Sequence, residues 1–289
     1  MTVEATERAS REIEDPTVGK VLSDKTFVVS DALIDDYFEG LTLDRSAFDR
    51  GETPLPTMTA RASDNYHEEA RFQQDKGHLW MRQQWAFHAP LQQGVSYTSH
   101  AKIEDIYERR DRTLVNTAIS VVDPDGVVAV SSNHHQSFLL KPPAENVEFR
   151  DPTKKEGARK FIVPDGDFIE PLDRVITLEM CGQYFHGSKS YHTDLQASQE
   201  LGFHNVVVGG AMTMSYLGHA LDNHFGAPWW TSGELDIKFT NPTWPDDHIT
   251  VKGVATGPSE EDPGRDHVFA WIEKDDGTIV LIANATVAR

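Results

Sequence analysis

Residues 192–221 read HTDLQASQELGFHNVVVGGAMTMSYLGHAL, and this segment contains the helices around which the rest of the chain is expected to fold. Its second part begins a long apolar helix, expected over about 213–225, directly after a Gly-Gly pair that permits a tight turn. A shorter helix is expected over 195–201, because Thr193 and Gln196 form a capping-box pattern and Gly202 supplies a stop. The long helix is expected to be buried, with these residues in the core: Met212, Met214, Tyr216 and Leu217.

Strand-like segments lie on both sides of this helical region in the sequence. They are rich in β-branched and aromatic residues and are separated by turn-forming residues. Four precede the helices, namely LWMRQQWAF (79–87), VSYTSHAKIEDIY (95–107), TLVNTAISVVD (113–123) and GVVAVSSNHHQSFLL (126–140). Four follow, namely GELDIKFTNP (233–242), HITVKGVATG (248–257), HVFAWIEKD (267–275) and TIVLIANATVA (278–288).

The two strand series are related by an internal repeat. The tetrapeptide FHAP at 87–90 is matched by FTNP at 239–242, an offset of 152, and the turn DG at 125–126 is matched by DG at 276–277, an offset of 151. The offsets agree and equal about half the chain, so they indicate a duplication. Each half is then a helix followed by a curled antiparallel sheet. This predicts an α+β double hotdog, in which each sheet wraps a central helix and the two sheets lie side by side.

Composition sets the expected boundaries of the halves. Residues 1–17 are charged and poor in large apolar side chains, which predicts a mobile N-terminal arm, with folding from Val18. Ser30 and Asp31 precede apolar residues at helical spacing, so a capped helix is expected there. The segment 141–160 is charged and contains proline, which predicts a linker between an N-terminal domain at 18–140 and a C-terminal domain at 161–289.

Charge and cysteine content limit the possible partners and compartment. The chain of 289 residues has 27 Lys and Arg against 46 Asp and Glu, a formal net charge of -19. That charge repels nucleic acids and anionic membranes, so neither is an expected partner. A single cysteine, Cys181, forms no intrachain disulfide, and no apolar run is long enough to span a bilayer. The N-terminus has no signal-peptide pattern, and a cytoplasmic location is expected.

The stretch 192–221 resembles the MaoC-like hydratase and dehydratase family, which includes the (R)-specific enoyl-CoA hydratases. His192-Thr193-Asp194 stands where the family has His-x-Asp, 202–203 where it has Gly-Phe, and VVGGAMTM at 207–214 where the family's glycine begins its central helix. The separation of 18 residues from His192 to Gly210 is also that of the family's catalytic histidine and oxyanion glycine. Residues 85–108 look like the noncatalytic N-terminal half of double-hotdog members.

The sequence departs from the family at one catalytic position. The family's dyad carries an Asp five residues before the histidine, and here that position is Gly187. We rank His186 first as the replacement, followed by a carboxylate from the polar stretch 61–77, such as Glu68 or Glu69. Lys189 is a candidate for an acidic substrate group or a CoA phosphate.

These residues could add water to an enoyl thioester or remove it. A histidine can exchange a proton at neutral pH, and unpaired N–H groups at a helix N-terminus can hold a developing oxyanion. The expected catalytic groups are therefore His192, Gly210 and His186, acting on a thioester of CoA or a carrier protein, with the acyl pocket in the N-terminal half. The groups expected to bind substrate are Gly209, Lys189, Thr213 and Glu68.

Some residues and reactions have competing interpretations. Asp194 fits the capping and dipole preference of a first helical turn better than a catalytic role. His134 and His135 are adjacent in a strand and point to opposite faces, so no metal is expected, and no cofactor either. A thioesterase and a noncatalytic thioester-binding or scaffold protein both remain alternatives, and the loss of the dyad Asp favours the second. Homodimerisation is left open.

Overall fold

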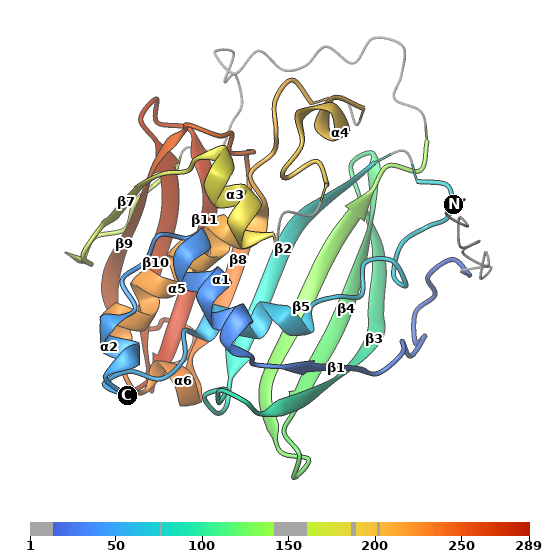
Figure 1. Ribbon diagram of the computed structural model, residues 1–289. Coiled ribbons are helices and arrows are strands. Elements are labelled where there is room, and N and C mark those ends of the chain that lie inside the picture. The colour runs from blue at the N-terminus through green and yellow to red at the C-terminus, as the bar shows by residue number, and fades with distance from the viewer. Residues whose placement is uncertain (1–13, 76, 142–160, 186–188, 201–202) are drawn as a thin grey trace, which may run out of the picture.

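The computed structural model describes residues 14–75, 77–141, 161–185, 189–200 and 203–289. Within these residues the strands form one antiparallel sheet in the order β1-β3-β4-β5-β2-β8-β11-β10-β9-β6, with β7 also paired to β9. Figure 1 shows this sheet curving behind the helices, with the N-terminal strands on one side and the C-terminal strands on the other. The chain therefore has the double hotdog fold that the repeat predicted.

Of the N-terminal strands, all but the first match the predicted runs within a few residues, and the first was not predicted. They are β1 (Lys25–Val28), β2 (His78–Phe87), β3 (Ser96–Arg109), β4 (Arg112–Val122) and β5 (Val128–Phe138). The predicted DG turn joins β4 to β5, with Gly126 at a φ of 81°. Asp123 Oδ1 accepts hydrogen bonds from the backbone N–H groups of Asp125 and Val127 in the same turn. A glycine at positive φ costs little, which explains the sharp reversal.

The C-terminal strands are β6 (Asp167–Phe168), β7 (Leu172–Val175), β8 (Glu234–Phe239), β9 (His248–Pro258), β10 (Arg265–Lys274) and β11 (Ile279–Ala288). The last four match prediction, whereas β6 and β7 were not predicted because they are short edge segments without a clear period of two. A second DG turn joins β10 to β11, with Gly277 at a φ of 77°.

The two halves meet where β2 pairs with β8. In this pairing Gln84 lies opposite Asp236, a residue 236 − 84 = 152 positions later and thus its own counterpart in the repeat. Antiparallel strands that place equivalent residues opposite each other are related by a local twofold axis. Arg82 of β2 reinforces the joint through two hydrogen bonds to the Asp236 carboxylate, at 2.7 and 2.6 Å.

The helices cover the concave side of the C-terminal strands. They are α1 (Asp31–Gly40), α2 (Ser46–Asp49), α3 (Leu178–Tyr184), α4 (Leu195–Glu200), α5 (Gly210–Phe225) and α6 (Trp229–Ser232), together with the 3-10 helix η1 (Thr57–Ser63). α5 is the central helix, and the four residues predicted in its core are all fully buried. It begins three residues earlier than predicted, because the Met212 N–H already bonds to the Gly209 carbonyl.

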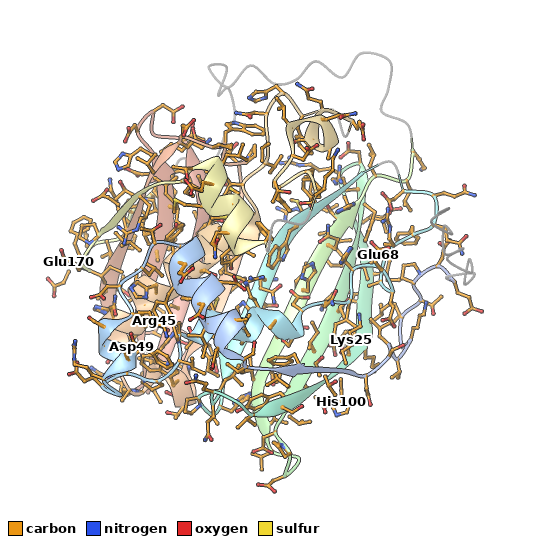
Figure 2. The ribbon with its side chains drawn as sticks, viewed as in Figure 1. Lys25, Arg45, Asp49, Glu68, His100 and Glu170 are labelled. Atoms are coloured by element: carbon orange, nitrogen blue, oxygen red, sulfur yellow. The ribbon has the colours of Figure 1, made fainter. Side chains whose placement is uncertain are left out.

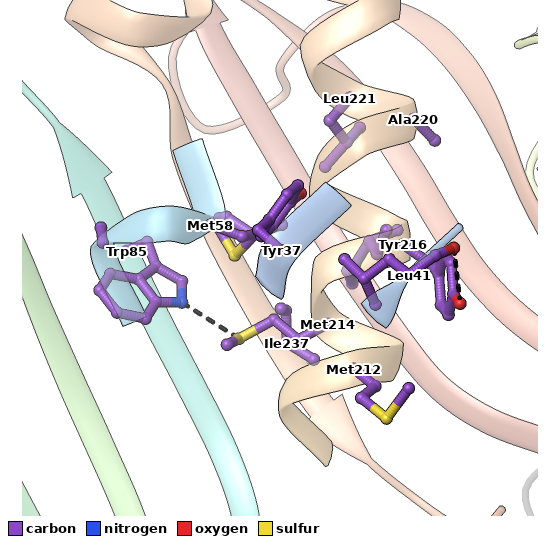
Figure 3. Close-up of a cluster of buried hydrophobic side chains, with 14 of the residues drawn as sticks. Tyr37, Leu41, Met58, Trp85, Met212, Met214, Tyr216, Ala220, Leu221 and Ile237 are labelled. Atoms are coloured by element: carbon purple, nitrogen blue, oxygen red, sulfur yellow. Dashed lines mark hydrogen bonds between the residues drawn. The ribbon is translucent and has the colours of Figure 1, made fainter. Parts of the chain in front are cut away.

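Segments of the N-terminal half pack on α5. The predicted cap of α1 is present, since Ser30 Oγ accepts the Leu33 N–H at 3.2 Å. Tyr37 of α1 donates to the Ser215 carbonyl of α5, and Met58 of η1 lies where a Cβ on Gly218 would be 2.3 Å from its Cγ. Figure 3 shows Tyr37 and Met58 packed beside the helix. A second, smaller core, which includes Tyr66, Phe72 and Phe138, lies on the N-terminal strands.

The predicted domain boundaries stay predictions. Most of the linker at 141–160 and residues 1–13 of the N-terminal arm lie outside the described residues. Among the described residues, no helix has the length and apolar character needed to cross a bilayer.

Candidate active site

His192 lies in the loop between α3 and α4 and is half-buried. Its Nδ1 is 2.7 Å from the carbonyl oxygen of Val207, the residue three positions before the first residue of α5. A carbonyl only accepts, so Nδ1 carries the proton, and in the neutral ring Nε2 holds the free lone pair. The chain entering α5 thus fixes both the orientation and the tautomer of His192.

The surroundings of His192 favour its neutral form. Burial lowers the pKa of His192, the hydrogen bond to Val207 partly opposes this, and the nearby His78 lowers the pKa further. Burial also lowers the pKa of His78 itself, at the start of β2. A neutral imidazole with its lone pair on Nε2 can act as a general base.

An aromatic side chain connects His192 to the head of α5. The Phe185 ring stacks on the His192 ring, with centroids 5.0 Å apart and planes 14° apart. The same ring lies against Gly209, where an added Cβ would be 2.3 Å from Phe185 Cζ. One face of the imidazole is therefore covered by Phe185, and the Tyr191 ring also lies against His192, with ring centroids 3.9 Å apart.

The head of α5 presents backbone N–H groups beside this aromatic cluster. Gly209 is the N-cap and Gly210 the first helical residue, so the Gly210 N–H has no carbonyl four residues earlier within the helix. A Cβ on Gly210 would be 3.2 Å from Phe239 and 3.3 Å from Trp80. Thr213, a predicted substrate-binding residue, is buried and donates its hydroxyl to the Gly210 carbonyl at 3.0 Å. This contact holds the first turn of the helix.

The other predicted site residues lie further out. Lys189 is exposed and lies 3.6 Å from the Asp194 carboxylate. Glu68 is exposed and contacts His67 at 2.8 Å and Arg71 at 3.5 Å, and Figure 2 shows it on the side formed by the N-terminal strands. Glu69 accepts the Ser23 N–H and pairs with Lys25. His186 lies outside the described residues.

The capping box predicted for α4 is wrong. Asp194, rather than Thr193, caps this helix, because its Oδ1 accepts the Ala197 N–H at 2.8 Å. The Thr193 hydroxyl instead accepts the Ser190 N–H, and Gln196 donates to Glu200. Asp194 directly precedes Leu195, the first helical residue, and is therefore at the capping position, whereas Thr193 lies one residue too early. The capping role expected for Asp194 is confirmed.

The sequence analysis did not predict that Trp80 of the N-terminal sheet lies beside Gly210. The Trp80 ring stacks on His134, with centroids 4.8 Å apart and planes 17° apart. His134 donates from Nδ1 to the Asp64 carboxylate at 2.6 Å and from Nε2 to Gln136 at 2.8 Å. Burial lowers the pKa of His134, but Asp64 outweighs it, and the pKa is raised overall. The role of Asp64 could not be recognised from the sequence, because its partner His134 is 70 residues further along the chain.

The adjacent histidine behaves as the strand pattern predicted. His135 points to the opposite face, where it contacts Tyr107 at 3.1 Å and Gln84 at 3.3 Å. Burial, with help from Arg82, lowers the pKa of His135 to about 4. Among the described residues, no three His, Cys, Asp or Glu side chains gather as they would around a metal ion.

These features define the chain as a double hotdog protein with a histidine beside the N-terminus of its central helix. No family model and no curated protein matches the sequence, but solved structures match its fold. One is a MaoC-like dehydratase, 14% identical, with a TM-score of 0.70 over 94% of this chain and 98% of that one. Another, from Phytophthora capsici, is also described as a MaoC-like dehydratase. It is 16% identical, with a TM-score of 0.70 over 96% of this chain and 97% of that one.

A third matching structure, from Mycobacterium tuberculosis, is described as having a double hotdog fold. It is 12% identical, with a TM-score of 0.60 over 94% of this chain and 96% of that one. The fold that the sequence resemblance implied is thus confirmed over nearly the whole chain.

Proposed function

We propose that this chain is a hydro-lyase that hydrates a 2-enoyl thioester, or dehydrates a 3-hydroxyacyl thioester, of CoA or a carrier protein. The observation that carries the proposal is the position of His192, which is fixed by a carbonyl only three residues before the head of α5. The reaction requires a group that takes a proton from water and gives one to C2, together with donors that stabilise the enolate oxygen; His192 and the free N–H groups can fill these two roles. The shared fold with MaoC-like dehydratases supports the same assignment.

The proposed reaction uses one base in both proton transfers. Nε2 of His192 takes a proton from water, whose oxygen bonds to C3 of the enoyl group. The C2–C3 double bond supplies the electron pair that moves onto the thioester oxygen, where the Gly210 N–H stabilises the enolate. The proton then passes from the imidazolium to C2 as the carbonyl reforms. Dehydration is the reverse sequence. Because His192 carries out both proton transfers, the scheme needs no additional carboxylate to exchange protons.

The test measures the disappearance of the enoyl absorbance of crotonyl-CoA and of longer and branched enoyl-CoAs. His192→Ala should lower kcat by a factor of about 10²–10⁴, the range typical for a general base. His204→Ala is the matched control, because this exposed histidine follows α4 and packs on Trp244. Activity of the wild type should fall as the pH drops through the lowered pKa of His192, since only the neutral ring is a base.

The same samples separate the alternatives. Release of free thiol, followed with a thiol reagent, would identify a thioesterase. Binding of enoyl-CoA without turnover, unchanged by His192→Ala, would instead identify a noncatalytic thioester-binding protein. Either result contradicts the hydro-lyase proposal.

A further inference from the structure

The concave face of the N-terminal sheet carries polar side chains beside the head of α5. Gln83 pairs with His134, and Trp85 pairs with Ser132, between strands β2 and β5. Residues directly opposite in an antiparallel pair point to the same face, as do residues two apart in one strand. Trp85 marks that face, because its Nε1 donates to Met214 Sδ of α5 at 3.3 Å, as Figure 3 shows.

Two of these polar groups are buried without a hydrogen-bond partner. Gln83 has no exposed surface, and Ser132 is 4% exposed. Within the described part of the chain, Gln83 Nε2 and Ser132 Oγ have no partner. The orientation of the Gln83 amide is fixed, because its Oε1 accepts the Trp80 Nε1–H at 3.2 Å. Nε2 therefore faces away from Trp80 and can only donate.

Leaving two such groups unpaired is costly. A buried donor without an acceptor has lost its hydrogen bond to water and gained none in return, so buried polar groups are normally satisfied. Gln83 and Ser132 are diagonal neighbours on the two strands, a relation that places side chains within reach of one small group. Both can donate to the same acceptor oxygen.

The position of these donors relates them to the proposed reaction. Trp80 lies against Gly210 on one side and bonds to Gln83 through its indole N–H. The indole is itself held by its stack on His134, which Asp64 fixes. A thioester whose carbonyl meets the Gly210 N–H would extend its acyl chain past Trp80 along this face. Gln83 and Ser132 are then the polar groups that the chain meets.

We infer that the acyl group of the substrate carries a second acceptor oxygen a few bonds beyond the thioester, and that Gln83 and Ser132 bind it. This inference rests on the proposed function and adds to it a substrate class, that of oxygen-bearing acyl thioesters. A plain hydrocarbon chain would bury the two donors without an acceptor, so the site discriminates against it.

The test measures dissociation constants by calorimetry for three unreactive esters, namely pentanoyl-CoA, 4-oxopentanoyl-CoA and glutaryl-CoA. The wild type should bind one of the two oxygen-bearing esters at least tenfold more tightly than pentanoyl-CoA. A preference for the ketone identifies a neutral acceptor, and a preference for glutaryl-CoA identifies a carboxylate. Gln83→Leu combined with Ser132→Ala should abolish the preference while pentanoyl-CoA binds as well as before.

The neighbouring residues on the same strands provide matched controls. Gln84→Leu and Ser131→Ala change the same residue types on the opposite face, where Ser131 contacts His88, and these variants should keep the preference. Equal affinity of the wild type for all three esters would overturn the inference and would leave a bound water as the partner of the two donors. Failure of every ester to bind would instead contradict the proposed function.

Discussion

The side chain of Phe185 explains why position 209 is a glycine. The Phe185 ring occupies the space of a Cβ at this position and also stacks on His192. Gly209 is buried and its φ of -63° is accessible to any residue, so contact rather than backbone conformation requires glycine.

We therefore predict that Gly209→Ala displaces Phe185, destabilises the protein by about 1–3 kcal/mol and lowers the proposed activity. Gly182→Ala is the control, because a Cβ at this position in α3 meets nothing within 4 Å. Alanine should be neutral or stabilising there, by up to about 1 kcal/mol. Urea unfolding of both variants measures the difference, and equal stabilities would show that Phe185 yields without cost.

For individual residues, the sequence reveals pairs that are related by a spacing along the chain better than contacts between distant segments. His192 and Gly210 could be proposed as a pair because their separation of 18 residues matches that of the family which the sequence resembles. The contact of Asp64 with His134 joins a loop to a strand, and that of Trp80 with Gly210 joins the two halves. Neither has a sequence period, so neither could be predicted.

Among the elements, η1 and α5 are joined by a buried carboxylate. Asp222 of α5 accepts the Thr57 hydroxyl at 2.7 Å and the Thr57 N–H at 3.2 Å. Burial raises the pKa of Asp222 to about 7, although the hydrogen bonds from Thr57 oppose this. The folded protein therefore holds a proton that the unfolded chain has lost between pH 4 and 7.

The sign of the resulting pH dependence is fixed by this raised pKa. The stability that the fold gains from a protonated Asp222 is fully present below the ordinary pKa of an aspartate, and it is lost as the pH rises through about 7. We predict that the stability of the wild type relative to Asp222→Asn falls by roughly 4 kcal/mol from pH 4 to pH 8. Thermal or urea unfolding across this range tests it, and a constant difference would contradict the raised pKa.

Elements with strong periodicity were predicted well, and short ones were not. The eight long strands and α1 agree with expectation, because alternation and helical spacing extend over many residues. α3 has only seven residues, and β6 and β7 have two and four. Such segments are stabilised by their neighbours rather than by their own pattern, for example by the pairing of β7 with β9.

For the whole molecule, the halves are joined too extensively to unfold separately. The sheet is continuous through β2 and β8, and residues of α1 and η1 pack on α5. We predict one cooperative urea transition, with coincident curves from tryptophan fluorescence and far-ultraviolet circular dichroism. Arg82→Met should shift the midpoint without splitting the curves, and two separated transitions would show that the halves fold independently.

The contact of Met58 with Gly218 also constrains how such a duplicated chain can evolve. Gly218 belongs to one half of the repeat and Met58 to the other, and a larger residue at 218 requires Met58 to move, because an added Cβ would be 2.3 Å from its Cγ. A selection for function from a library randomised at both sites should recover larger residues at 218 only with smaller ones at 58. Because one half of the chain covers the central helix of the other half, substitutions in the two halves are no longer independent of each other.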